Sequence, residues 1–214
     1  MSALPGFGLV AQPAGEPSRS IDFWAYRVGT GNWSDIKFEN GDGEIAALQL
    51  GKTVKGPVYE YRGPSQLAFF RDISAPIAAD PRNLTRQTIA QVVIPSGLEK
   101  GILIFTANKV DPESGREFHV FLINGDPDEF PANSLRVFNA TGVRLAGKVG
   151  RETLYFEAGQ SEAFNLSPFL EEGIPVAFLV ETRQGPRFVY EKNLHYRENR
   201  RVILLLEPPR RRGS

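Results

Sequence analysis

Short runs of apolar residues, separated by Gly, Pro and Asn, recur along most of the chain. Residues 21–27 are rich in aromatic side chains and end at Gly29-Thr30-Gly31, which predicts a strand that enters a loop. Residues 88–94 and 101–106 predict two more strands, and the second, which is almost wholly apolar, is expected to be buried. The turn signal Asn40-Gly41-Asp42-Gly43 predicts a hairpin, because Asn and Gly accept positive φ.

The segment 116–124 alternates with a period of two, yet both of its faces are apolar. One face carries Phe118, Val120 and Leu122, and the other carries His119, Phe121 and Ile123. A strand with two apolar faces is typical of the inside of a sheet structure. We therefore expect this strand to lie inside a sandwich rather than at its edge.

A second series of strands follows the acidic, proline-containing stretch 126–131, which is the candidate module boundary. Its predicted strands are 135–139, 143–149, 153–157, 163–166, 175–182, 187–193 and 201–206. Gln184-Gly185-Pro186 predicts a hairpin turn between two of them. Turn signals about every 8 to 12 residues are typical of β-sandwiches and barrels.

Helix signals are confined to residues 167–173, where Ser167 could cap one or two turns and Gly173 would end them. No βαβ pattern is present, which disfavours a parallel α/β fold. The prediction is an all-β fold, an antiparallel β-sandwich or partial barrel in two packed modules; one continuous sandwich is the alternative. The expected divisions are a flexible lead-in at 1–19, modules at 20–131 and 132–207, and a basic tail at 208–214.

Two stretches of the second series carry a resemblance to a known group of proteins. They are Phe130-Pro131-Ala132-Asn133-Ser134-Leu135-Arg136-Val137-Phe138-Asn139-Ala140-Thr141-Gly142 and Leu154-Tyr155-Phe156-Glu157-Ala158-Gly159-Gln160-Ser161. This order resembles a module of uncharacterised exported β proteins of verrucomicrobial and planctomycete-type bacteria. The resemblance covers residues 130–209. It implies a small envelope-associated sandwich in an extracytoplasmic location, and it supplies no catalytic residues.

Composition excludes several classes of function. The 214 residues include 25 basic and 25 acidic side chains, so no net field directs the protein to nucleic acid. The absence of cysteine excludes disulfides, thiolate zinc sites, iron–sulfur clusters and a cysteine nucleophile. No apolar run approaches the roughly 18 to 20 residues of a membrane span, so the chain is not expected to cross a membrane.

Few residues combine in a pattern that carries chemistry. His119 and His195 lack the H-E-x-x-H spacing, and no Gly-x-Ser-x-Gly turn or phosphate-binding glycine loop occurs. Oxygen ligands in Asn40-Gly41-Asp42-Gly43-Glu44 could suit Ca²⁺, but the EF-hand order is absent and a plain hairpin turn is favoured. We predict no cofactor and no resident metal.

Both tryptophans lie within ten residues of each other, and flat aromatic faces can stack on sugar rings. The candidate ligand-binding residues are Trp24, Tyr26, Trp33, Asp22, Arg27 and Asp35. A buried core cluster is the other interpretation, since Trp is mostly buried. The favoured function is a non-enzymatic structural or binding protein of the bacterial envelope or extracellular space, with a protein or polysaccharide partner and an open oligomeric state. The alternatives are a carbohydrate-binding module using Trp24 and Trp33, and a hydrolase-type enzyme.

Overall fold

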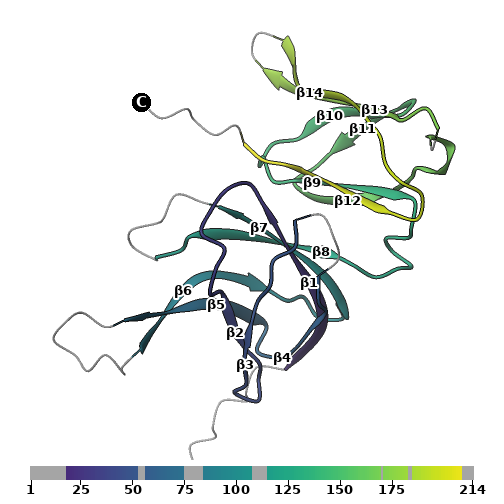
Figure 1. The fold of residues 1–214 in the computed structure, drawn as a ribbon. Helices are drawn as coiled ribbons and strands as arrows, with labels where there is room; N and C mark the ends of the chain where they lie inside the picture. Colours follow the sequence, from purple (N-terminus) through teal and green to yellow (C-terminus); the bar gives the residue numbers. More distant parts are fainter. Residues whose placement is uncertain are drawn as a thin grey trace, which may run out of the picture.

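The fold is known from a computed structural model that describes residues 18–52, 56–74, 84–107, 115–169, 171–182 and 185–208. Fifteen strands and one short 3-10 helix make up the described part of the chain (Figure 1). The strands are β1 Arg19–Val28, β2 Lys37–Glu39, β3 Ile45–Ala47, β4 Tyr59–Gly63, β5 Gln66–Ser74, β6 Leu84–Val93, β7 Lys100–Ala107, β8 Phe118–Asn124, β9 Ser134–Asn139, β10 Leu145–Val149, β11 Glu152–Phe156, β12 Gly159–Asn165, β13 Ile174–Thr182, β14 Gly185–Leu194 and β15 Arg201–Leu206. The prediction of an all-β fold is confirmed.

Strands β1–β8, here called the N-terminal module, form two facing sheets. Their strand orders are β4-β1-β7-β8 and β3-β2-β5-β6. Apolar side chains from both sheets meet in one core, in which Phe23 of β1, Phe69 of β5 and Phe105 of β7 are fully buried. The module is therefore a β-sandwich, and neither sheet closes into a barrel.

Strands β9–β15, here called the C-terminal module, repeat the same topology. Their sheets have the orders β12-β9-β15 and β11-β10-β13-β14. Counting from the first strand of each module, both modules read 4-1-7 in one sheet and 3-2-5-6 in the other. Among the described residues the N-terminal module has an additional eighth strand, which pairs with the seventh. The chain is thus a tandem pair of β-sandwiches of one design.

The correspondence extends to a bulge at one position. In the β5/β6 pair the register shifts between Phe69 and Phe70, and in the β13/β14 pair it shifts between Phe178 and Leu179. Both bulges follow an alanine and a fully buried phenylalanine. The extra residue bends each hairpin over its core in the same way.

The centre of each core is filled by a phenylalanine from a different strand. Phe38 of β2 lies opposite Phe69, whereas its counterpart opposite Phe178 is Gly147 of β10. A Cβ at Gly147 would lie 2.7 Å from a ring atom of Phe156 and 2.8 Å from one of Phe178. Phe156 of β11 therefore takes the space that Phe38 fills in the other module.

Each module contains one parallel pair, in contrast to the antiparallel fold that was predicted throughout. β1 runs parallel to β7, and β9 runs parallel to β15. Each of these pairs joins the first strand of a module to its seventh. The chain between the two strands forms the opposite sheet of the sandwich, so no βαβ crossover helix is required. The remaining strand pairs are antiparallel.

The modules stack through the outer faces of their 4-1-7 sheets (Figure 1). A third apolar cluster lies between them, centred on Ile102, Ile104, Ile123 and Phe130. Phe121 of β8 packs on Phe138 of β9, with 5.1 Å between ring centroids.

This stacking corrects the prediction for β8, which is the edge strand of its sheet rather than an inner strand. Its second apolar face, with Phe121 and Ile123, is buried because the C-terminal module covers it. A sequence pattern that is apolar on both faces reports burial of both faces. It does not report that both edges are paired.

Local predictions at turns are confirmed in two places. Residues 40–44 connect β2 and β3, with the Asn40 amide donating to Glu44 O and Gly43 at φ 82°. β13 and β14 form the predicted hairpin pair, in which Gly185 and Pro186 already belong to β14 and lie opposite Thr182 and Glu181, while Gln184 lies outside the described residues. The predicted helix shrinks to the 3-10 turn Ser167–Phe169, and Asn165 rather than Ser167 supplies the capping oxygen, to the Ser167 amide.

Sheet pairing changes between Asn124 and Ser134, on either side of the predicted boundary at 131/132. The division into modules at 20–131 and 132–207 stays a prediction. The predicted lead-in, apart from its last two residues, and the basic tail from residue 209 onward lie outside the described residues.

Candidate functional site

The six residues predicted to bind a ligand lie on different surfaces. Along β1, Phe23 and Ala25 enter the core of the N-terminal module, so Trp24 and Tyr26 point to the other face and pack on the cluster between the modules. Trp33 packs against the core side. The two tryptophans therefore lie on opposite faces of the β4-β1-β7-β8 sheet.

The acidic members of that set are exposed and separate. Asp22 lies near the start of β1, and Asp35 sits in the loop before β2 with φ 55°. Arg27 approaches one of the tryptophans, with its guanidinium 5.9 Å from the ring centroid of Trp33. Sugar binding by Trp24 and Trp33 stays a prediction, and one flat ligand cannot reach both from a single face.

Trp33 belongs to a stack of two aromatic rings, each of which also contacts an arginine. Its ring stacks on Phe118 at 4.8 Å with 21° between the planes. Arg27 caps the tryptophan, and the Arg71 guanidinium lies 5.6 Å from the centroid of Phe118. Each such contact is favourable because a cation is attracted to the negative face of a ring. We call Arg27, Trp33, Phe118 and Arg71 the cation–ring stack.

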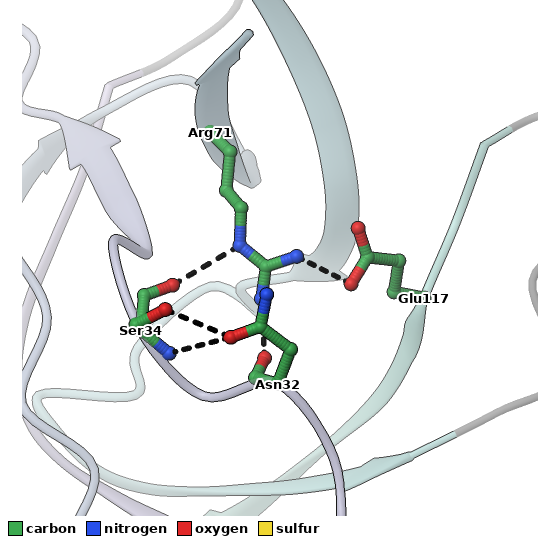
Figure 2. Close-up of polar contacts among 4 residues, drawn as sticks. All are labelled: Asn32, Ser34, Arg71 and Glu117. Atoms are coloured by element: carbon green, nitrogen blue, oxygen red, sulfur yellow. Dashed lines mark hydrogen bonds and ion pairs between the residues drawn. The ribbon is translucent and has the colours of Figure 1, made fainter.

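Arg71 also ties the loop before β2 to the start of β8 (Figure 2). Its Nε donates to Ser34 O at 3.0 Å, and a second nitrogen donates to Asn32 O. A third nitrogen pairs with Glu117 at 2.5 Å. Because the Arg71 side chain is only 12% exposed and three of its nitrogens bond to the protein, we interpret it as an internal clamp.

A second pair of arginines fixes the segment that links the modules. Arg136 donates to Asn124 O and Glu129 O, and Arg201 donates to Gly125 O at 3.0 Å. Both guanidinium groups lie against the ring of Phe130, at 5.0 and 5.7 Å. These contacts anchor the linker backbone to the C-terminal module.

Burial between the modules changes two acid–base equilibria. Loss of solvent lowers the pKa of the Arg136 guanidinium, against the opposing effect of Glu129. It raises the pKa of the Tyr26 phenol, and nearby Arg201 partly offsets this.

The remaining residues with possible chemistry are dispersed. His119 and His195 are both exposed. Within the described residues no group of three or more His, Asp and Glu could hold a metal ion. Over the same residues, no helix has the length and apolar character needed to cross a membrane.

The clearest unusual feature is the free edge of β15. In the N-terminal module the seventh strand, β7, lies between β1 and β8, and its residues 101–106 are all buried. In the C-terminal module the seventh strand, β15, has β9 as its one partner among the described residues, and all six of its residues are partly exposed. Its sequence, Arg201-Val202-Ile203-Leu204-Leu205-Leu206, is as apolar as that of an inner strand.

In the opposite sheet of each sandwich, β6 of the N-terminal module and β14 of the C-terminal module also differ in how far they are buried. Ile89 and Val189 are the extra residues of the two corresponding bulges. Ile89 is fully buried, and its carbonyl accepts the Glu117 amide just before β8. Val189 is 52% exposed, and its neighbour Phe188 is 60% exposed. We call the free edges of β15 and β14 the open seam. In the N-terminal module the corresponding edges, of β7 and β6, are covered by β8 and by Glu117, the residue before it.

The backbone of β15 is oriented to accept another strand. Arg200 O and Leu206 O accept amides from the β9 side, so even-numbered residues face β9. Alternate residues of a strand point their N–H and C=O groups in opposite directions. Arg201, Ile203 and Leu205 therefore direct these groups away from β9. At the corresponding positions of β7, Lys100 O accepts the Gly125 amide on the β8 side.

Sequence reasoning did not find the open seam, because β15 has the apolar sequence of an inner strand. Only the missing partner distinguishes it from β7. Comparison with protein-family models, curated proteins and solved structures gives no match to this chain. The fold and the seam therefore define only a class, a tandem pair of β-sandwiches of which the second has no closing strand within the described residues.

Proposed function

We propose that this protein is a non-enzymatic binding or scaffold protein that adds a β-strand of another polypeptide to β15 of its C-terminal module. The observation that carries the proposal is the contrast between β7, closed by β8, and β15, which has the same sheet position and no eighth strand beside it in the part of the chain that the structure describes. Strand addition to an exposed edge is a common mode of protein recognition, in which main-chain hydrogen bonds give affinity.

The strand that closes the N-terminal module supplies the chemistry of the expected partner. β8 is antiparallel to β7 and presents apolar side chains on both faces. One face, with Phe118, enters the core, and the other, with Phe121 and Ile123, packs on the neighbouring module. A partner strand for β15 is therefore expected to be extended, antiparallel and apolar on both faces.

An unprotected apolar edge also needs a partner for reasons of solubility. Proteins protect exposed edge strands with lysine, proline or bulges, because unpaired N–H and C=O groups recruit other chains. β15 contains neither lysine nor proline, and its register with β9 is unbroken.

An envelope or extracellular location belongs to the same proposal and is supported by the resemblance of residues 130–209 to exported β proteins.

A labelled peptide of residues 117–124, titrated into the full chain and followed by fluorescence anisotropy, tests the proposal. We expect saturable binding, because the peptide reproduces β8. N-methylation at Phe121, whose amide faces the seventh strand in the parent module, should weaken binding at least about tenfold. N-methylation at Leu122, whose amide faces away, is the matched control and should have little effect. Equal loss with both peptides, or no binding by the unmodified peptide, would contradict strand addition.

A further inference from the structure

The open seam can be closed by the same strand of a second molecule. We propose that two copies of this chain pair antiparallel through β15 and form one continuous sheet across the two C-terminal modules. This inference rests on the proposed function, since it names the polypeptide that supplies the added strand.

The hydrogen-bonding groups of β15 match those of its own copy. Arg201, Ile203 and Leu205 point their N–H and C=O groups outward at regular spacing, as derived above from the carbonyls that face β9. In an antiparallel pair, residues that exchange hydrogen bonds lie directly opposite each other. Two β15 strands therefore pair with outward-facing residues opposite outward-facing residues. A closed, two-fold contact of this kind is the commonest form of homo-oligomer.

Charge at the ends of the strand selects one register. Arg201 opens β15, and Glu207 follows its last residue. In the register centred on Leu204, Arg201 of each copy lies opposite Glu207 of the other, and Ile203 lies opposite Leu205. The two ends are thus charge-complementary, and apolar residues meet along the middle.

Apolar side chains around the open seam also favour β15 of a second copy as the added strand. Val202, Leu204 and Leu206 pack only partly on the core of their own module, and Ile203 and Leu205 pack partly on the cluster between modules. A second β15 brings the same alternation of apolar side chains, which is also the pattern of β8. Both faces of the added strand would then be covered, as both faces of β8 are.

Sedimentation velocity over a concentration series of the full chain tests this inference. We expect a reversible monomer–dimer equilibrium. Ile203→Pro removes an outward N–H while leaving the bonds toward β9, and should weaken dimerisation at least about tenfold. Ile203→Val keeps the amide and is the control. Circular dichroism confirms that each variant is folded. A dimer that is unchanged by Ile203→Pro would overturn the inference.

Cysteine cross-linking tests the register, and the natural absence of cysteine keeps the result simple. Leu204→Cys places two thiols opposite each other at a non-hydrogen-bonded pair, where Cα atoms approach to about 4.5 Å. Oxidation should therefore yield a covalent dimer. Val202→Cys, which lies opposite Leu206 of the copy, should yield little. Equal cross-linking of both variants would contradict the register.

The outcomes separate this inference from the proposed function. A chain that stays monomeric at every concentration but binds the peptide of residues 117–124 would overturn pairing with a second copy and leave strand addition supported. A monomeric chain that binds no such peptide would overturn both.

Discussion

The two modules share one strand order, one parallel closure between first and seventh strands, and one bulge, but they differ in a single strand. β8 closes the N-terminal module along one side, and nothing among the described residues closes the C-terminal module there. The consequence is local and large: Ile89 is fully buried, and the corresponding Val189 is 52% exposed. The comparison teaches what the apolar edge of β15 lacks within the described residues, because the corresponding strand β7 has a partner on both sides in the same chain.

The largest expected effects come from the paired phenylalanines at the bulges. Phe69→Ala and Phe178→Ala each remove a fully buried ring, and each should cost about 3 to 5 kcal/mol of unfolding free energy. Urea unfolding followed by circular dichroism measures both. A severe loss at one position and none at the other would show that the two cores are not equivalent.

The contrast between closed and open sides gives a sharper prediction. Ile89→Ala should cost about 2 to 5 kcal/mol, because it leaves a cavity under β8. Val189→Ala should change stability by no more than about 0.5 kcal/mol, since half of this side chain already faces solvent. Both are measured by urea unfolding at low protein concentration, so that self-association does not contribute. Equal losses would mean that the C-terminal module is closed after all.

The clamp on the start of β8 is expected to have an intermediate effect. Arg71→Met leaves the carbonyls of Asn32 and Ser34 without their donor and Glu117 without its partner, which should cost about 1 to 3 kcal/mol. Arg62→Met is the control, because its pair with Glu60 is exposed and should contribute less than about 1 kcal/mol. Urea midpoints of the two variants test whether Arg71→Met is the more destabilising. A larger loss in Arg62→Met would show that Arg71 does not hold the start of β8 in place.

The smallest effect is a dependence on alkaline pH. Burial raises the pKa of Tyr26 above its ordinary value of 10.0 in the folded state, so the folded chain holds this proton more tightly than the unfolded chain. The contribution is fully present below pH 10 and is lost as pH rises through 10 toward the folded pKa. Tyr26→Phe should therefore flatten, but not abolish, the fall in the urea midpoint above pH 10, because the pKa values of Tyr61 and Tyr196 are also raised. An unchanged slope in Tyr26→Phe would contradict burial of this phenol between the modules.

Much of the fold could be predicted, because strand patterns and turns are local. Residues 21–27 and 101–106 were expected as strands and lie in β1 and β7, and Asn40 and Gly43 form the expected hairpin turn. The internal repeat could not be found in this way. Corresponding positions carry unlike residues, such as Phe38 and Gly147, since each core is filled from a different strand.

The candidate site was largely beyond sequence reasoning for a related reason. Trp24 and Trp33 are near neighbours in sequence, yet the alternation of β1 and the loop that follows put them on opposite sides of a sheet. Arg71 and Glu117 meet across 46 positions of sequence. The open seam depends on the lack of a second neighbour for β15 among the described residues, and no pattern within β15 itself shows whether a neighbour is present.

The central claim is that β15 is a seventh strand without its eighth, and amide hydrogen exchange measured by NMR on the monomeric chain tests it most directly. The amides of Ile102 and Ile104, which face β8, should be strongly protected. Those of Ile203 and Leu205, at the corresponding positions of β15, should exchange rapidly and become protected when the peptide of residues 117–124 is added. Equal protection of both pairs in the monomer without peptide would contradict the account.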